Sequence, residues 1–194
     1  MTGRAAVFLD RDGVLVEDTG ALVHADDVRV LPGVIEALVS LREHGLALVV
    51  VSNQTVVARG LAGEDDVIAV QLAIESRLVA AGAPAFDDFL FCPHHPSATD
   101  PAYRVACDCR KPAPGLILRA CARHGIDPRR SVMVGDRPSD LAAGAQAGCR
   151  TVWVQTGRHA DAPIETTSPF ATPTADHVCD GLCAAARWIT GRAA

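Results

Sequence analysis

One stretch constrains the fold of this chain more than any other: Val7-Phe8-Leu9-Asp10-Arg11-Asp12-Gly13-Val14. The apolar run from Ala5 to Leu9 is typical of a buried strand, and it ends on two carboxylates one residue apart. Gly13 then lets the chain turn away. On extended backbone, Asp10 and Asp12 point to the same side, close enough to share a cation. If this motif stood alone, an ordinary Asp-rich turn after a strand would explain it, but further motifs follow.

Apolar runs alternate with segments of helical spacing along the rest of the chain. We expect further strands at 46–51, 89–91, 132–134 and 151–154, with an edge strand at 176–178. We expect helices at 34–42, 65–81, 114–124, 141–147 and 182–189. Residues 160–175, rich in Pro, Thr and Ala, predict a surface loop. The pattern predicts a single α/β domain over residues 1–194, a three-layer Rossmann-like parallel sheet covered on both faces.

Three of the expected strands end on polar residues: Asp10, Ser52 and Asp136. Ligands of open parallel sheets lie beyond the carboxyl ends of the strands, so one pocket can collect all three. Asp12 and Asp140 would add further carboxylates there, and such a cluster repels itself unless it holds a cation. Oxygen ligands alone favour Mg²⁺, which commonly binds a phosphate oxygen as well.

These residue types suit phosphoryl transfer. An aspartate whose charge is screened by a metal can attack phosphorus, and this would form an aspartyl phosphate. A second carboxylate two residues later can protonate the leaving group and then activate water. Ser52 offers a hydroxyl to a phosphoryl oxygen, and Lys111 offers a compact cation.

A second set of residues has the composition of a metal site. Cys92-x-His94 and Cys107-x-Cys109 supply three thiols and one imidazole, which suits a closed, tetrahedral Zn²⁺ site. We expect a structural zinc that stiffens the 92–109 loop and shapes the pocket around Lys111. Packed thiols without a metal are the alternative.

Composition narrows the function further. The formal net charge of −5 gives no support for binding nucleic acid or an anionic membrane, and the longest apolar run, 46–51, is too short to span one. The odd number of cysteines, seven, and a start without signal-peptide features favour a reducing cytoplasm. We expect a cytoplasmic monomer that acts on a small molecule.

The motifs resemble, in order, the four signatures of the haloacid dehalogenase (HAD) superfamily of phosphohydrolases. The matching segments are Asp10-x-Asp12-Gly13, Ser52-Asn53-Gln54, Lys111-Pro112 and Gly135-Asp136-x3-Asp140. The resemblance implies that Asp10 is the nucleophile and Asp12 the general acid and base, and that Ser52 and Lys111 hold the phosphoryl group. It also implies that Asp10, the backbone carbonyl of Asp12, and Asp136 bind Mg²⁺, and that Asp140 supports the site. It further implies a HAD-like fold, here with a minimal cap.

The zinc loop resembles that of two branches of the superfamily, the heptose 1,7-bisphosphate phosphatases and the histidinol-phosphate phosphatases. Its length, and Ala58-Arg59-Gly60 after the second motif, favour the heptose branch, which removes the 7-phosphate. A phosphosugar-binding protein without catalysis is a third, weaker alternative. The resemblance places substrate contacts at Asp18, Thr19, Gly20, Ala21, Asn53, Gln54, Arg59 and Arg110. The family usually has an aromatic residue at the position of Ala21, and Ser-Gly at that of Thr55-Val56.

Overall fold

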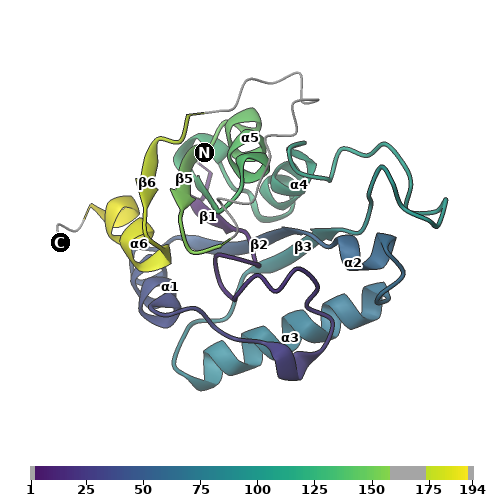
Figure 1. Ribbon diagram of the computed structural model, residues 1–194. Helices are drawn as coiled ribbons and strands as arrows, with labels where there is room; N and C mark the ends of the chain where they lie inside the picture. The colour runs from purple at the N-terminus through teal and green to yellow at the C-terminus, as the bar shows by residue number, and fades with distance from the viewer. Residues whose placement is uncertain (1–2, 158–173, 192–194) are drawn as a thin grey trace.

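A parallel sheet forms the centre of the computed structural model, which describes residues 3–157 and 174–191 (Figure 1). Its order is β3-β2-β1-β4-β5-β6. The strands are β1 (Ala6–Leu9), β2 (Ala47–Asn53), β3 (Asp88–Cys92), β4 (Val132–Gly135), β5 (Arg150–Val154) and β6 (His177–Cys179). Strands β2 and β3 lie on one side of β1, and β4, β5 and β6 lie on the other side, so the order of the strands reverses between β1 and β4. In open α/β sheets the crevice at such a switch point binds the ligand.

Helices cover both faces of this sheet, which confirms the predicted three-layer α/β fold. They are α1 (Val34–Glu43), α2 (Thr55–Ala58), α3 (Glu64–Ala80), α4 (Gly115–His124), α5 (Pro138–Ala147) and α6 (Leu182–Thr190). Short 3-10 turns lie at Ala25–Asp27 and Pro128–Arg130. In the described part of the chain, no helix is both long enough and apolar enough to cross a membrane.

Alternate residues of each strand build two separate cores. Val7 and Leu9 belong to the core that α1, α3 and α6 cover, whereas Ala6 and Phe8 belong to the core beneath α4 and α5. All four side chains are fully buried. Burying one large apolar side chain contributes about 1.5–3 kcal/mol, so β1 is anchored from both sides. The residues that follow it are therefore held in a defined place.

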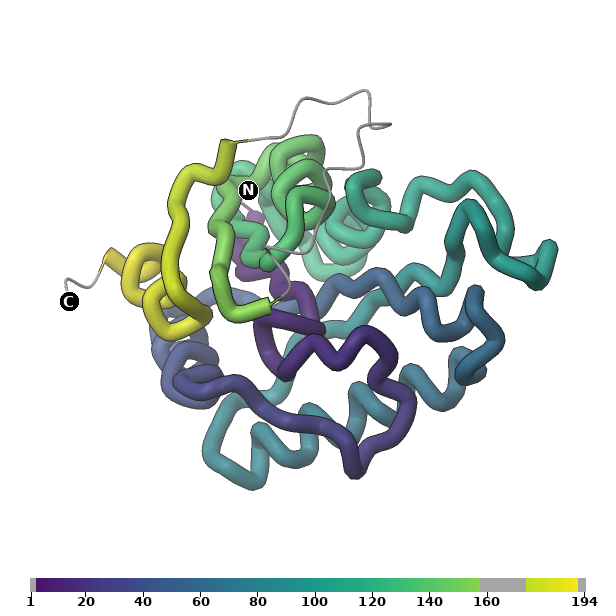
Figure 2. Tube along the Cα trace, viewed as in Figure 1, coloured from purple at the N-terminus to yellow at the C-terminus, as the bar shows by residue number. Residues whose placement is uncertain are grey.

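The connection between β1 and α1 contains no inserted domain. Among its residues only the 3-10 turn Ala25–Asp27 is regular, in agreement with the minimal cap that we expected. Figure 2 shows this segment in dark purple, looping away from β1 and returning to α1, while the teal segment between β3 and α4 extends from the body of the molecule.

The structure differs from the sequence prediction in a few places. Helix α2, at Thr55–Ala58, was not expected, and the edge strand lies at His177–Cys179, one residue later than predicted. The predicted surface loop at 160–175 lies outside the described residues except for its last two positions.

Candidate active site

Three carboxylates and one ammonium meet at the ends of β1 and β4. Carboxylate oxygens of Asp10, Asp136 and Asp140 lie within 4.8 Å of one another. Lys111 donates from Nζ to Oδ1 of Asp10 over 2.8 Å, and the same Nζ lies 2.7 Å from Oδ1 of Asp140. The four residues are at most 6% exposed. The strand ends thus bring together residues from three of the four predicted motifs.

The charges of this cluster are not balanced. Burial, and then the nearby carboxylates of Asp10 and Asp140, raise the pKa of Asp136 to about 8. Burial also raises the pKa of Asp140 to about 6, although Lys111 opposes the change. Burial alone would lower the pKa of Lys111, but Asp10 and Asp140 hold it above its usual value. An oxygen-only cluster with excess negative charge fits a hard cation such as Mg²⁺.

Asp12 lies beside this cluster and has different partners. Arg11 donates to its carboxylate from Nε, at 3.2 and 3.1 Å from the two oxygens, and Nη2 of Arg11 lies 2.9 Å from Oδ2. Gln54 donates from Nε2 to Oδ2 of Asp12 over 2.9 Å and to Oγ of Ser52 over 2.8 Å. Burial raises the pKa of Asp12, against the effect of Arg11. A raised pKa suits a carboxyl group that must give up a proton.

Asn53 holds the backbone of Lys111 in place. Its Nδ2 donates to the carbonyl of Lys111, and its Oδ1 accepts from the Lys111 N–H, each over 3.0 Å. The end of β2 therefore fixes the start of the Lys111 side chain. The side chain of Asn53 is occupied by this contact, and that of Gln54 by Arg11, Asp12 and Ser52.

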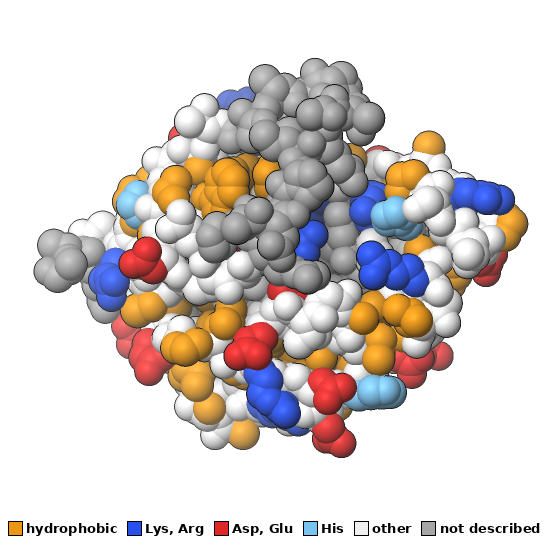
Figure 3. Space-filling model, viewed as in Figure 1, with side chains coloured by type: hydrophobic (Ala, Val, Ile, Leu, Met, Phe, Trp, Pro, Cys, Tyr) orange, Lys and Arg blue, Asp and Glu red, His pale blue; other side chains and the backbone are white. Residues whose placement is uncertain are grey.

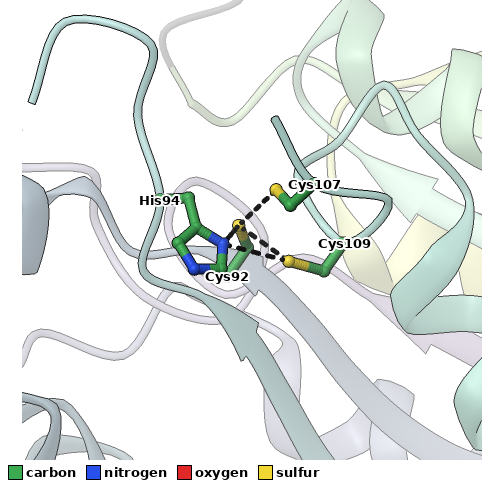
Figure 4. A group of neighbouring side chains, drawn as sticks. All are labelled: Cys92, His94, Cys107 and Cys109. Atoms are coloured by element: carbon green, nitrogen blue, oxygen red, sulfur yellow. Dashed lines mark hydrogen bonds between the residues drawn. The ribbon is translucent and has the colours of Figure 1, made fainter. Parts of the chain in front are cut away.

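The cysteines and the histidine predicted to bind zinc meet in one place (Figure 4). Nδ1 of His94 lies 3.5 Å from Sγ of Cys92 and 3.4 Å from Sγ of Cys109. Sγ of Cys92 lies 3.7 Å from Sγ of Cys107 and 3.2 Å from Sγ of Cys109. Zinc–sulfur bonds of about 2.3 Å in a tetrahedron separate the sulfurs by about 3.8 Å. The spacing therefore fits a single zinc ion.

The remaining predicted substrate residues lie outside the carboxylate cluster, and their contact with a substrate stays a prediction. Asp18 forms an ion pair with Arg137 over 2.6 Å and accepts from the N–H of Gly20. Thr19, Gly20 and Ala21 are exposed, as is Arg59 at the end of α2. Arg110 is half-buried and donates to the carbonyl of His94 over 3.1 Å. The side chain of Asp12 is not in the carboxylate cluster, and its carbonyl as a metal ligand stays a prediction.

Sequence reasoning missed three residues of this site. Arg11 is 1% exposed, and its position between two carboxylates in a buried stretch was a usable signal. Arg137 directly follows Asp136 in the chain, and its side chain forms an ion pair with Asp18. No local sequence pattern indicates this pairing. A Cβ added to Gly157 would lie 2.0 Å from Oδ2 of Asp136, so only a glycine fits there without displacing that carboxylate.

Known proteins of similar sequence and structure support one family. A family model described as HAD-hydrolase-like matches residues 108–185. The D-glycero-beta-D-manno-heptose-1,7-bisphosphate 7-phosphatase of Photorhabdus laumondii is 40% identical over 170 residues, which cover 87% of this chain and 88% of the relative. The protein of the same name from Vibrio cholerae is 38% identical, and the match covers 91% and 94% of the two chains.

A solved structure agrees with these relatives. The D,D-heptose 1,7-bisphosphate phosphatase of B. bronchiseptica, crystallised with magnesium and phosphate, superimposes with a TM-score of 0.81 at 33% identity. The superposition covers 97% of this chain and 99% of that one. The fold, the grouped motif residues and the near-complete coverage lead to one conclusion: this chain belongs to the heptose-bisphosphate phosphatase family of HAD hydrolases.

Proposed function

We propose that this chain hydrolyses the 7-phosphate of D-glycero-D-manno-heptose 1,7-bisphosphate through a phosphorylated Asp10. The observation that carries the proposal is the contact of Lys111 with Asp10 and Asp140, beside Asp136, in a chain that spans 88% of a relative named for this reaction. The relatives' names favour this reaction over hydrolysis of histidinol phosphate.

The first step transfers the phosphoryl group to the enzyme. A carboxylate oxygen of Asp10 attacks phosphorus, and the bond from phosphorus to the sugar oxygen breaks. The electron pair of that bond stays on the sugar oxygen, which takes a proton from the carboxyl group of Asp12. Lys111 orients Asp10 and offsets negative charge on the phosphoryl oxygens, and the hydroxyl of Ser52 donates to one of them.

The second step returns the enzyme to its starting state. Asp12, now a carboxylate, takes a proton from water while the water oxygen attacks phosphorus. The bond between Asp10 and phosphorus breaks, and inorganic phosphate leaves. Mg²⁺ held by Asp10, Asp136 and the carbonyl of Asp12 would neutralise charge on the transferred group in both steps.

The basic side chains near the zinc loop support a substrate with a second phosphate. Basic side chains lie on the side of the molecule where the segment between β3 and α4 projects (Figure 3), and they are arginines, because Lys111 is the one lysine of the sequence and is 3% exposed. Arg59 and Arg110 are our candidates for binding the 1-phosphate, because a guanidinium binds phosphate through paired hydrogen bonds. A zinc ion at Cys92, His94, Cys107 and Cys109 would hold Arg110 and Lys111 in position, since Cys109 directly precedes them.

The experiment compares phosphate release from both anomers of heptose 1,7-bisphosphate and from histidinol phosphate, each with Mg²⁺. We expect a strong preference for the heptose substrate, with phosphorus NMR showing heptose 1-phosphate as the product. Preference for histidinol phosphate, or loss of the 1-phosphate, would contradict the proposed substrate. Variants Arg59→Met and Arg110→Met should raise KM for the bisphosphate more than for a monophosphate.

A further inference from the structure

We propose that Arg11 and Gln54 form a buried pair of positioning residues that holds the general acid Asp12 and orients Ser52. The inference rests on the proposed chemistry of Asp12. Its carboxylate accepts hydrogen bonds from Nε of Arg11 and from Nε2 of Gln54, and Nη2 of Arg11 forms an ion pair with its Oδ2 over 2.9 Å. The Asp12 side chain is 23% exposed, so without these donors it could rotate towards solvent.

Arg11 determines which way the amide of Gln54 faces. A guanidinium has only donors, and Nη2 of Arg11 lies 2.8 Å from Oε1 of Gln54, which must therefore be the oxygen of the amide. The two hydrogens of Nε2 then face Asp12 and Ser52. Loss of Arg11 would remove this constraint and allow the amide to flip.

The orientation of Gln54 acts on Ser52 in turn. Oγ of Ser52 accepts a hydrogen bond from Nε2 of Gln54, so its own hydroxyl hydrogen points elsewhere. Ser52 is the last residue but one of β2 and is 1% exposed, and the carbonyl of Val51, directly before it, accepts from Nζ of Lys111 over 2.8 Å. The hydroxyl is thus prepared to donate to a phosphoryl oxygen. One arginine therefore prepares both the proton donor and a phosphoryl-binding group.

The stability of the fold does not explain a buried arginine at this position. The Arg11 side chain is 1% exposed, and within residues 3–157 and 174–191 its Nη1 atom has no hydrogen-bond partner. Burying a charge costs free energy, and an unpaired donor adds to that cost. A residue kept at such a cost fits a role in catalysis.

If Arg11 and Gln54 position Asp12, the rate lost on replacing either residue should depend on the leaving group of the substrate. A sugar alkoxide needs a proton as it leaves, whereas p-nitrophenolate leaves without one. A misplaced Asp12 should therefore slow the first step for the sugar substrate alone. Asp12 also activates water in the second step, so hydrolysis of the phosphorylated enzyme should be slower with both substrates.

The test uses the full-length variants Arg11→Met and Gln54→Met with Mg²⁺, on heptose 1,7-bisphosphate and on p-nitrophenyl phosphate. Arg42→Met is the matched control, because Arg42 also pairs with an aspartate, Asp87, over 2.8 Å, at the opposite end of β2 from Ser52. If one of the two site variants does not fold, the other decides the question.

We expect kcat on the bisphosphate to fall about 100-fold in either site variant, with KM little changed. On p-nitrophenyl phosphate the first turnover should stay close to that of the wild type, with slow turnovers after it. Equal losses in first turnovers on both substrates, or no loss, would overturn the inference. If the wild type does not hydrolyse the bisphosphate, the proposed substrate is wrong, and the p-nitrophenyl phosphate burst still decides the role of Arg11.

Discussion

Lys111 donates from its buried ammonium to Oδ1 of Asp10 over 2.8 Å, although 101 positions separate the two residues in the chain. The same Nζ also contacts Asp140. The lysine is therefore the one protein cation that touches both the proposed nucleophile and its neighbouring carboxylate within the described residues. Its removal should affect catalysis and stability together.

The variant Lys111→Met should lower kcat by at least about 100-fold, because the phosphoryl group loses a stabilising charge. It should also lose about 3–5 kcal/mol of unfolding free energy, since Asp10 and Asp140 stay buried without the ammonium that balances their charge. Added Mg²⁺ should restore part of that loss. The control Arg123→Met removes an exposed ion pair with Asp88 and should cost at most about 1 kcal/mol. Chemical denaturation with and without Mg²⁺ measures each effect, and equal costs in the two variants would contradict the assignment.

The cysteine cluster should contain about one zinc per chain by metal analysis. Replacing Cys107 by Ser should release zinc and lower the melting temperature, because the loop loses the bonds that fix it. Activity should fall as well, since Cys109 lies two residues before Lys111. Cys121→Ser is the control, because the Cys121 thiol lies outside the cluster. Full activity after complete removal of zinc would show that the loop does not position Lys111.

Gly157 should be needed for Mg²⁺ binding. A Cβ at this position would lie 2.0 Å from Oδ2 of Asp136, and Thr156 fixes the backbone nearby by donating to the carbonyl of Gly13 over 2.6 Å. In Gly157→Ala the Asp136 carboxylate must move, so activity should require much more Mg²⁺. In Gly63→Ala the new Cβ would meet its nearest neighbour, in Asp66, at 3.6 Å, and the Mg²⁺ requirement should not change. Mg²⁺ titrations of kcat compare the two variants.

Asp87 should stabilise the protein at neutral pH but not in acid. Burial would raise its pKa, but hydrogen bonds from Arg42, the N–H of Leu48 and Arg4 hold the pKa below its usual value. Such a carboxylate contributes stability above the pKa of the unfolded chain, about 3.9, and loses it as the pH falls through the lower folded pKa. Asp87→Asn should therefore cost about 1–3 kcal/mol at pH 7 and progressively less below about pH 4.

Urea unfolding between neutral and acidic pH checks this sign. Asp65→Asn serves as the control, because Asp65 is an exposed residue in the first turn of α3. A cost of Asp87→Asn that does not change with pH would contradict the role of the ionised carboxylate.

The sequence was sufficient to predict the sheet and the strand ends that meet at the site. Solid apolar runs before Asp10, Ser52 and Asp136 indicated parallel strands, and parallel strands place their carboxyl ends along one edge. The four-residue helix α2 was missed because one helical turn has no periodicity to detect.

The partners of individual side chains could not be predicted in the same way. Arg11 meets Gln54 across 43 positions, and Gly157 meets Asp136 only because β4 and β5 pair side by side. Such contacts depend on register and packing, which local patterns do not contain. The stretch Val7–Val14 indicated a charged residue among buried ones, but not which carboxylate Arg11 would serve.

The most direct test of the account measures Mg²⁺-dependent phosphate release from D-glycero-β-D-manno-heptose 1,7-bisphosphate by the wild type and by Asp10→Asn. The account predicts that the wild type releases one phosphate per molecule of substrate. Asp10→Asn should lose turnover by several orders of magnitude while it keeps its zinc and its cooperative unfolding, because an amide cannot form the phosphoryl intermediate. Turnover by Asp10→Asn at the wild-type rate would contradict the central role of Asp10.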